Sequence, residues 1–163
     1  PEWMTDAPEF EDTNFMLSAL NAYGVLEDDS TKRWAKAFLI APAIRVIFEL
    51  SLLALDKSCD EIHLPNIGVS AKHKENVSYV HRLFKNNKFQ DYLQAGRIVF
   101  DTYQEAHSVI ENTDFGESVE YSSLGSHKSM KDYDIDTIMR LSNDAVLFAM
   151  LCQQYVQFKK QGV

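Results

Sequence analysis

The sequence predicts an all-α fold, a single compact bundle of five or six helices. Its apolar residues recur mostly in steps of three and four, the spacing that places them on one face of an α-helix. Only 6 Gly and 4 Pro interrupt 163 residues. The composition, 45% hydrophobic and 25% charged, suits one globular domain with a continuous core. We therefore expect one helical domain over residues 1–163.

The chain is predicted to open with an extended lead-in and a short helix. Residues 1–12 are acidic and contain proline, which favours an extended segment. A helix is expected over residues 13–24, where a glycine can end it. Phe15 and Leu17 are expected to supply apolar contacts from this helix.

A second helix is expected over residues 31–55, bent or broken near Pro42, because proline has no N–H to donate. It contains the most apolar stretch of the chain, residues 38–55. This stretch is at the short end of the about 17–25 residues that cross a bilayer, and Arg45 and Glu49 near its middle are costly in lipid. It is therefore predicted to be a buried helix, and not a membrane span. Arg45 and Glu49 share one helix edge, and the sequence leaves open whether that edge faces solvent or the interior.

The middle of the chain is predicted to hold a connection and two amphipathic helices. Residues 56–72 contain turn residues, and within them residues 60–64 could form one strand of a short β-ribbon. A helix is expected over residues 74–85, followed by an interruption at "KNNK". The clearest apolar stripe covers residues 89–110 and predicts one helix of about five turns, with Gly96 inside it.

The C-terminal part is predicted to be a loop and a core helix. Residues 113–131 lose periodicity and gain Ser and Gly, which predicts a long mobile loop, with a second ribbon strand over residues 118–122. The last helix is expected over residues 132–160, with carboxylates at its start and lysines at its end, as the helix dipole favours. Residues 145–152 are apolar on every side, which predicts a central helix or one shared with a partner.

The net charge of the chain limits the kinds of partner that it is expected to bind. A net charge of −8 argues against binding to a nucleic-acid backbone and against adsorption to anionic membranes. A basic protein partner fits this charge, and so does plain solubility. Cys59 and Cys152 show no metal or redox spacing, and a disulfide between them is left open. No signal peptide is visible, so the expected location is cytoplasmic, although a removed leader would leave no trace before Pro1.

Motifs that carry chemistry are missing from the sequence. It has no Glu-x-x-His pair, no His-Glu-x-x-His and no Cys/His knuckle, so neither a metal nor a cofactor is expected. Gly-x-Ser-x-Gly, the phosphate-binding loop and the dinucleotide fingerprint are also absent. Catalytic groups converge in space, so the sequence does not decide whether the chain is an enzyme, and the missing motifs favour a non-enzymatic role.

Two histidines are candidates for a pocket. His81 lies on the apolar face of the helix expected over residues 74–85. His107 lies next to the apolar stripe of the helix expected over residues 89–110. The functional interpretation is a general base that works with Arg45 and Glu49. The structural interpretation, which is favoured, is a histidine at the core edge bonded to a neighbouring carbonyl.

The leading hypothesis for function is a non-enzymatic protein-interaction domain, such as an adaptor, assembly subunit or inhibitor, whose acidic surface receives a basic partner. The alternative is a small-molecule-binding or enzymatic pocket inside the bundle, using His107 and His81 with Arg45 and Glu49. Self-association, and mimicry of nucleic acid by the acidic surface, are further options, the last ranked lowest because the carboxylates are spread out. The candidate aromatic anchors of an interface are Trp34, Phe38, Tyr92, Phe100 and Tyr103.

Overall fold

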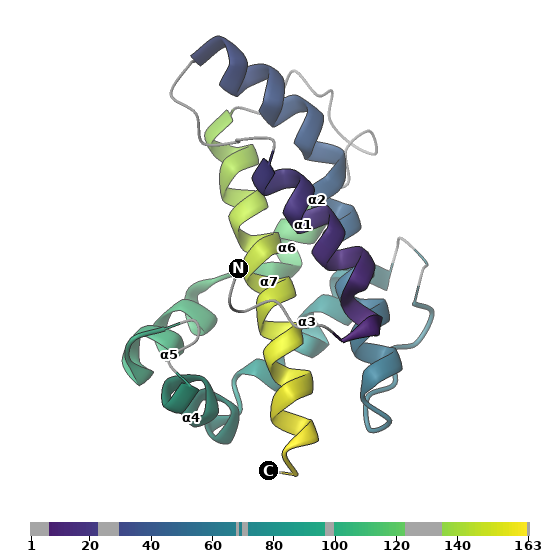
Figure 1. Cartoon of the computed structure of the whole chain (residues 1–163), viewed down its shortest axis with the longest axis vertical. Helices are drawn as coiled ribbons and strands as arrows, with labels where there is room; N and C mark the ends of the chain where they lie inside the picture. Colours follow the sequence, from purple (N-terminus) through teal and green to yellow (C-terminus); the bar gives the residue numbers. More distant parts are fainter. Residues whose placement is uncertain are drawn as a thin grey trace.

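The described part of the chain folds into helices alone (Figure 1). The computed structural model describes residues 7–22, 30–67, 69, 72–96, 100–122 and 135–162, without the side chains of residues 19–22 and 30–41. These residues form η1 (Pro8–Phe10), α1 (Glu11–Ala22), α2 (Ser30–Ser58), α3 (His73–Phe84), α4 (Asn87–Gly96), α5 (Tyr103–Asn112), α6 (Phe115–Tyr121) and α7 (Ile135–Lys160). The predicted all-α class is therefore confirmed for the described residues.

α1 begins earlier than the sequence suggested. The expected extended segment over residues 1–12 is wrong in its second half, because a 3-10 turn and the start of α1 occupy residues 8–12. Residues 1–6 lie outside the described part. Thr13 and Leu17, four positions apart, are buried, and the amide of Gln153 on α7 donates a 2.7 Å hydrogen bond to Asn14 Oδ1. These contacts fix one face of α1 to the rest of the fold.

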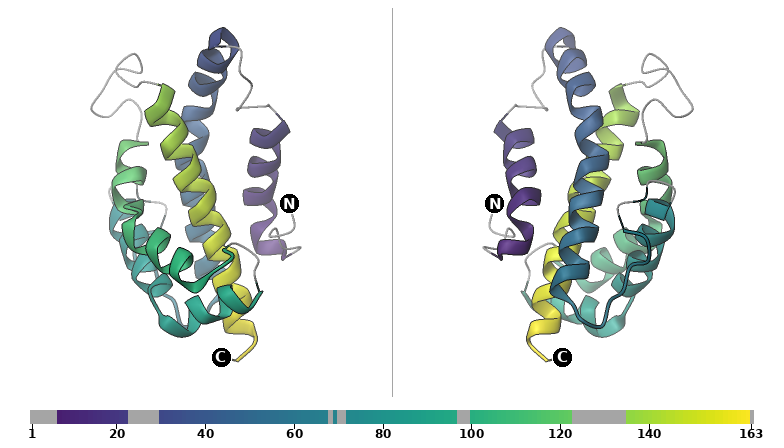
Figure 2. Two further views of the ribbon diagram at one scale, coloured as in Figure 1. Left: turned by 90° about the vertical axis from the view of Figure 1, so that its left-hand side faces the viewer. Right: turned by 90° about the vertical axis from the view of Figure 1, so that its right-hand side faces the viewer.

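α2 runs without a break through Pro42. A proline in a helix removes one hydrogen bond, here the one to the carbonyl of residue 38, and the packing on either side can offset that loss. The packing comes from α7: α2 and α7 lie side by side and run in the same direction (Figure 2). Ile44, Ile47 and Phe48 are buried on α2. Figure 2 also shows α1 on one side of this helix pair and α3–α6 on the other.

The stripe over residues 89–110 belongs to two helices, and the prediction of one helix is wrong. α4 ends at Gly96, and α5 starts after Thr102, whose side chain accepts a hydrogen bond from the Glu105 amide. The stripe persists because Phe89 and Leu93 on α4 and Ala106 and Ile110 on α5 are all buried. A periodic pattern alone does not distinguish one long helix from two short ones that turn the same face to the core.

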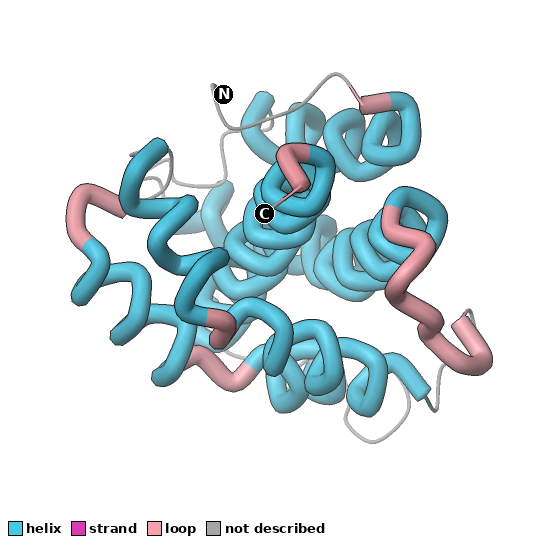
Figure 3. The backbone as a smooth tube through the Cα atoms, turned by 90° about the horizontal axis from the view of Figure 1, so that it is seen from below, coloured by secondary structure: helices cyan, strands magenta, loops and turns pink. Residues whose placement is uncertain are grey.

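Two further expectations are corrected by the structure. The first part of the expected loop over residues 113–131 is the helix α6. Its N-cap is Asp114, whose carboxylate accepts a 2.9 Å hydrogen bond from the Glu117 amide. The rest of that loop, from residue 123, lies outside the described part. The β-ribbon is also wrong: residues 60–64 form a turn and irregular backbone, and residues 118–121 are helical. Figure 3 shows helices joined by loops and no strand in the described chain.

Aromatic rings fill the contact between α7 and the layer of α3–α6. Phe84 at the end of α3 has four ring neighbours with centroids between 5.7 and 6.4 Å away: Phe89, Phe115, Phe148 and Tyr155. Large aromatic side chains contribute much of the apolar area that a core removes from water. This cluster therefore joins α3, α4, α6 and α7.

Candidate functional site

The edge of α2 that carries Arg45 and Glu49 is half-buried and lies against the start of α3. Glu49 Oε1 is 3.3 Å from Nε2 of His73, the first residue of α3, and the His73 side chain is only 4% exposed. This distance is short enough for an ion contact, yet the Nε2 atom makes no hydrogen bond. We attribute the difference to poor alignment of the two groups, because the distance alone would allow a bond. The edge thus faces a buried imidazole.

His73 favours its neutral form. Burial is the main cause and lowers the pKa of the imidazole below its ordinary value, and Arg45 lowers it further. The carboxylate of Glu49 raises the pKa and opposes both effects without cancelling them. A charged ring would also lie at the N-terminus of α3, where the helix dipole disfavours a cation.

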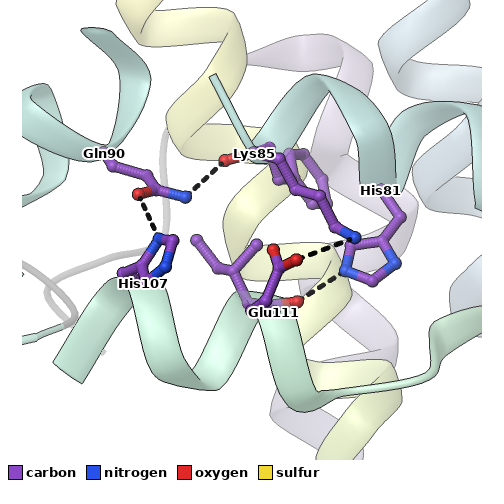
Figure 4. A network of polar contacts seen from close by, with 7 residues as sticks. His81, Lys85, Gln90, His107 and Glu111 are labelled. Atoms are coloured by element: carbon purple, nitrogen blue, oxygen red, sulfur yellow. Dashed lines mark hydrogen bonds and ion pairs between the residues drawn. The ribbon is translucent and has the colours of Figure 1, made fainter. Parts of the chain in front are cut away.

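His81 is bonded to the backbone of α5. Its Nε2 lies 2.6 Å from the carbonyl oxygen of Ile110 (Figure 4). Since a carbonyl can only accept, Nε2 carries the proton and donates. The ring also meets Phe115 edge-on, with centroids 5.0 Å apart. Burial lowers the pKa of His81, and the bond to Ile110 opposes that shift only in part.

His107 belongs to a chain of polar contacts between α4 and α5 (Figure 4). Its Nδ1 lies 3.3 Å from Oε1 of Gln90, and the Gln90 amide donates to the Phe84 carbonyl at 3.4 Å. Lys85 and Glu111 form an ion pair at 3.6 Å in the same region. These contacts hold α5 against α3 and α4, which is a structural role.

The four residues of the expected pocket are divided between two places. Arg45 and Glu49 lie beside His73, whereas the described partners of His81 and His107 come from α4, α5 and α6. His73 itself was not singled out from the sequence. One signal could have identified it: His73 extends the stripe of Val77, Val80 and Phe84 by one turn toward the N-terminus.

The aromatic candidates differ in exposure. Phe100 is buried, with 7% of its surface exposed. Tyr92 is half-buried between Phe89 and Phe158. Tyr103 is half-buried, stacks on His107 and bonds through its hydroxyl to Asn87 at 3.4 Å. Trp34 and Phe38 lie on α2, and their side chains are outside the described part.

An exposed aromatic side chain lies elsewhere, on α1. Phe15 is 73% exposed, so its expected role as an internal contact is wrong. Glu11, Asp12 and Ser18 are exposed on the same helix, and Glu11 and Ser18 lie four and three positions from Phe15. We call Glu11, Asp12, Phe15 and Ser18 the outer face of α1. The apolar period of α1 alone did not reveal which of its faces is buried.

The thiols and acidic side chains do not indicate a reactive centre. Cys59 and Cys152 are free and buried, and burial raises the pKa of both thiols, which keeps them protonated and unreactive. Among the residues that the structure describes, no group of three or more His, Cys, Asp or Glu side chains could hold a metal ion. Within the same residues, no helix is long and apolar enough to cross a membrane.

Comparisons with protein-family models, with curated proteins and with solved structures found no match. The chemistry of the side chains described above is therefore the basis for a functional proposal.

Proposed function

We propose that this chain is a helical protein-interaction domain, an adaptor, assembly subunit or inhibitor, that binds a basic amphipathic segment of another protein. The observation that carries the proposal is the outer face of α1, where Phe15 is 73% exposed beside Glu11 and Asp12. Buried aromatic anchors supply much of the affinity of protein interfaces, and carboxylates near such an anchor attract cationic partners.

The way α1 is held supports this role. Thr13 and Leu17 bury the opposite face of the helix, and Asn14 accepts a hydrogen bond from Gln153. With α7 taken as the central helix of the domain, α1 is a surface layer fixed in place before a partner arrives. A preordered binding surface loses less conformational entropy on association than a flexible one.

Charge and thiol state complete the proposal. The net charge of −8 favours a basic partner over an acidic one. We propose a cytoplasmic location, in which the buried thiols of Cys59 and Cys152 would stay reduced. Trp34 and Phe38 remain candidates for a second contact, whereas Tyr92, Phe100 and Tyr103 already pack within the domain.

The test uses a lysine-rich amphipathic helical peptide and fluorescence anisotropy. We expect the parent chain to bind it and Phe15→Ala to weaken binding at least tenfold, a loss of about 1.4 kcal/mol. Val69→Ala is the matched control, because Val69 is also exposed, at 49%, but lies in the connection before α3. Binding should weaken as salt is added, since exposed charges are screened. Equal affinity for the parent and Phe15→Ala would contradict the proposal.

A second experiment addresses the natural partner. A photo-reactive amino acid at position 15 should capture a basic protein in the source cell, whereas the same group at position 69 should not. The alternative, a small-molecule pocket, has less support because His81 and His107 are engaged with Ile110 and Gln90. A small molecule that raises the melting temperature of the parent but not of His81→Gln would favour that alternative.

A further inference from the structure

The contact between α2 and α3 contains a buried side-chain nitrogen atom, in His73, that makes no hydrogen bond. His73 Nε2 is enclosed by the protein, and its nearest ionic group is Glu49 Oε1, 3.3 Å away without hydrogen-bond alignment. A buried polar atom that lacks a partner costs free energy that an exposed one does not. The contact between α2 and α3 therefore carries a free-energy cost, and a change in the protonation of His73 alters that cost.

The charges around the ring act in opposite directions. Burial and Arg45 disfavour the imidazolium, and Glu49 favours it. The other charged groups at this end of α3 are engaged elsewhere: Lys72 pairs with Glu75 at 3.2 Å, and Lys74 pairs with Glu120 of α6 at 2.6 Å. The protonation state of His73 therefore depends chiefly on burial and on the two groups of α2.

We propose that His73 is a proton-operated latch: the neutral ring holds the first turn of α3 against α2, and protonation releases that turn into water. In the closed state the ring resists a proton because it is buried, and in the open state it is hydrated and takes one readily. Protons therefore bind the open state more tightly and shift the population toward it. The closed state gains stability above the ordinary pKa of histidine and loses it as the pH falls through the lower pKa of His73 in the closed state.

The latch is local because the rest of α3 is anchored. Val77, Val80 and Phe84 have no exposed surface, so they hold the helix after its first turn has opened. His81, eight positions further on, is a different case. Its ring is bonded to Ile110 and lies in the last turn of α3, where the helix dipole favours a cation.

The proposal is tested by native-state hydrogen exchange of the full chain between pH 7.5 and pH 5.0. The reporters are the amides of Asn76 and Val77, which lie in the first turn that has intrahelical hydrogen bonds. The pKa of His73 is measured by NMR in the same sample. After correction for the intrinsic exchange rate, the opening constant should rise tenfold for each unit by which that pKa lies below the ordinary 6.5.

Substitutions of Arg45 and Glu49 on α2 should have opposite effects on His73. Arg45→Gln should raise the pKa of His73 toward its ordinary value and make the acid-induced rise of the opening constant smaller, because Arg45 opposes the imidazolium of the closed state. Glu49→Gln should lower the pKa further and make that rise larger. His73→Gln should abolish the acid response at Asn76 and Val77, whereas the control His81→Gln should retain it.

Three results would overturn the latch. The first is an opening constant in the parent that is the same at pH 7.5 and pH 5.0. The second is an acid response that persists in His73→Gln. The third is a change of the acid-induced rise of the opening constant in the same direction for Arg45→Gln and Glu49→Gln, and this pair still decides the question if His73→Gln does not fold.

Discussion

His81 occupies the apolar face of α3 and donates to a carbonyl of a neighbouring helix, as the structural interpretation of the sequence described. Its helix and its face follow from the local pattern, so this much could be predicted. The partner itself could not be predicted for either histidine, because Ile110 is 29 positions from His81 and Glu49 is 24 positions from His73, each on another helix. The exposure of Phe15 depends in the same way on which face of α1 meets α2 and α7. Single residues are therefore predictable only as far as their partners are local.

At this scale the stability of the fold should depend on His81. Its pKa is lowered by burial, so the folded chain binds fewer protons than the unfolded chain just below pH 6.5. This contribution is present above pH 6.5 and is lost as the pH falls through the folded pKa. We expect the free energy of unfolding, measured in urea at pH 7.5 and pH 5.5, to fall less in His81→Gln than in the parent. Comparing the two chains cancels the contributions of all other groups, and an equal fall would contradict the prediction.

Helices are predicted well where the apolar period is strong, but their ends depend on particular residues. The interruption after α3 was expected, and Asn86 there accepts hydrogen bonds from the amides of Lys88 and Phe89. α6 was missed because it is only seven residues long, less than two full turns of pattern. The break between α4 and α5 was missed although Gly96 and Thr102 both mark it.

Pro42 offers a test of how α2 is held. An alanine at position 42 restores an N–H that can donate to the carbonyl of residue 38 and removes the ring clash. Because Pro42 is exposed, the change removes little packing. We expect Pro42→Ala to stabilise the fold by up to about 3 kcal/mol in urea denaturation. The neighbouring change Ala43→Gly is the control and should destabilise by about 1 kcal/mol. A loss of stability in Pro42→Ala would show that the packing of α2 requires the proline.

Gly116 tests the contact between α6 and α3. A Cβ atom at this position would lie 2.7 Å from Oγ of Ser78, which is too close. Alanine favours a helix over glycine by about 1 kcal/mol, whereas overpacking costs about 1–3 kcal/mol. We expect Gly116→Ala to destabilise the parent by about 1 kcal/mol but to stabilise a Ser78→Ala background by about 0.5–1 kcal/mol. Thermal denaturation of the four chains measures this coupling, and its absence would mean that the Ser78 side chain rotates away freely.

At the scale of the whole molecule, the fold depends on side-chain contacts between three layers: α1, the pair of α2 and α7, and α3–α6. The helical class follows from composition and from the apolar period. The burial of α7 follows from its apolar residues on every side, which need several neighbouring helices to cover them. The parallel course of α2 and α7 could not be predicted, since their contacts join segments about 100 residues apart. The aromatic cluster around Phe84 depends on that arrangement.

At this scale we predict a large difference between two phenylalanines. Phe84 has no exposed surface and touches rings on α4, α6 and α7, so Phe84→Ala should cost about 3–5 kcal/mol. Phe15→Ala should change the free energy of unfolding by less than about 0.5 kcal/mol, because Phe15 is 73% exposed. Urea denaturation of both variants measures the contrast. Similar losses in the two variants would mean that Phe15 contributes to the core.

The hydrogen bond between Asn14 and Gln153 joins residues 139 positions apart, and it has a consequence for synthesis on the ribosome. α1 and α2 leave the ribosome well before α7, and at about 5–20 residues per second the wait is roughly 5–20 s. During that time the apolar face of α2 around Ile47 and Phe48 has no α7 to cover it. The nascent chain therefore has a period in which chaperones can bind α2, and crowded nascent chains can aggregate, before the fold closes.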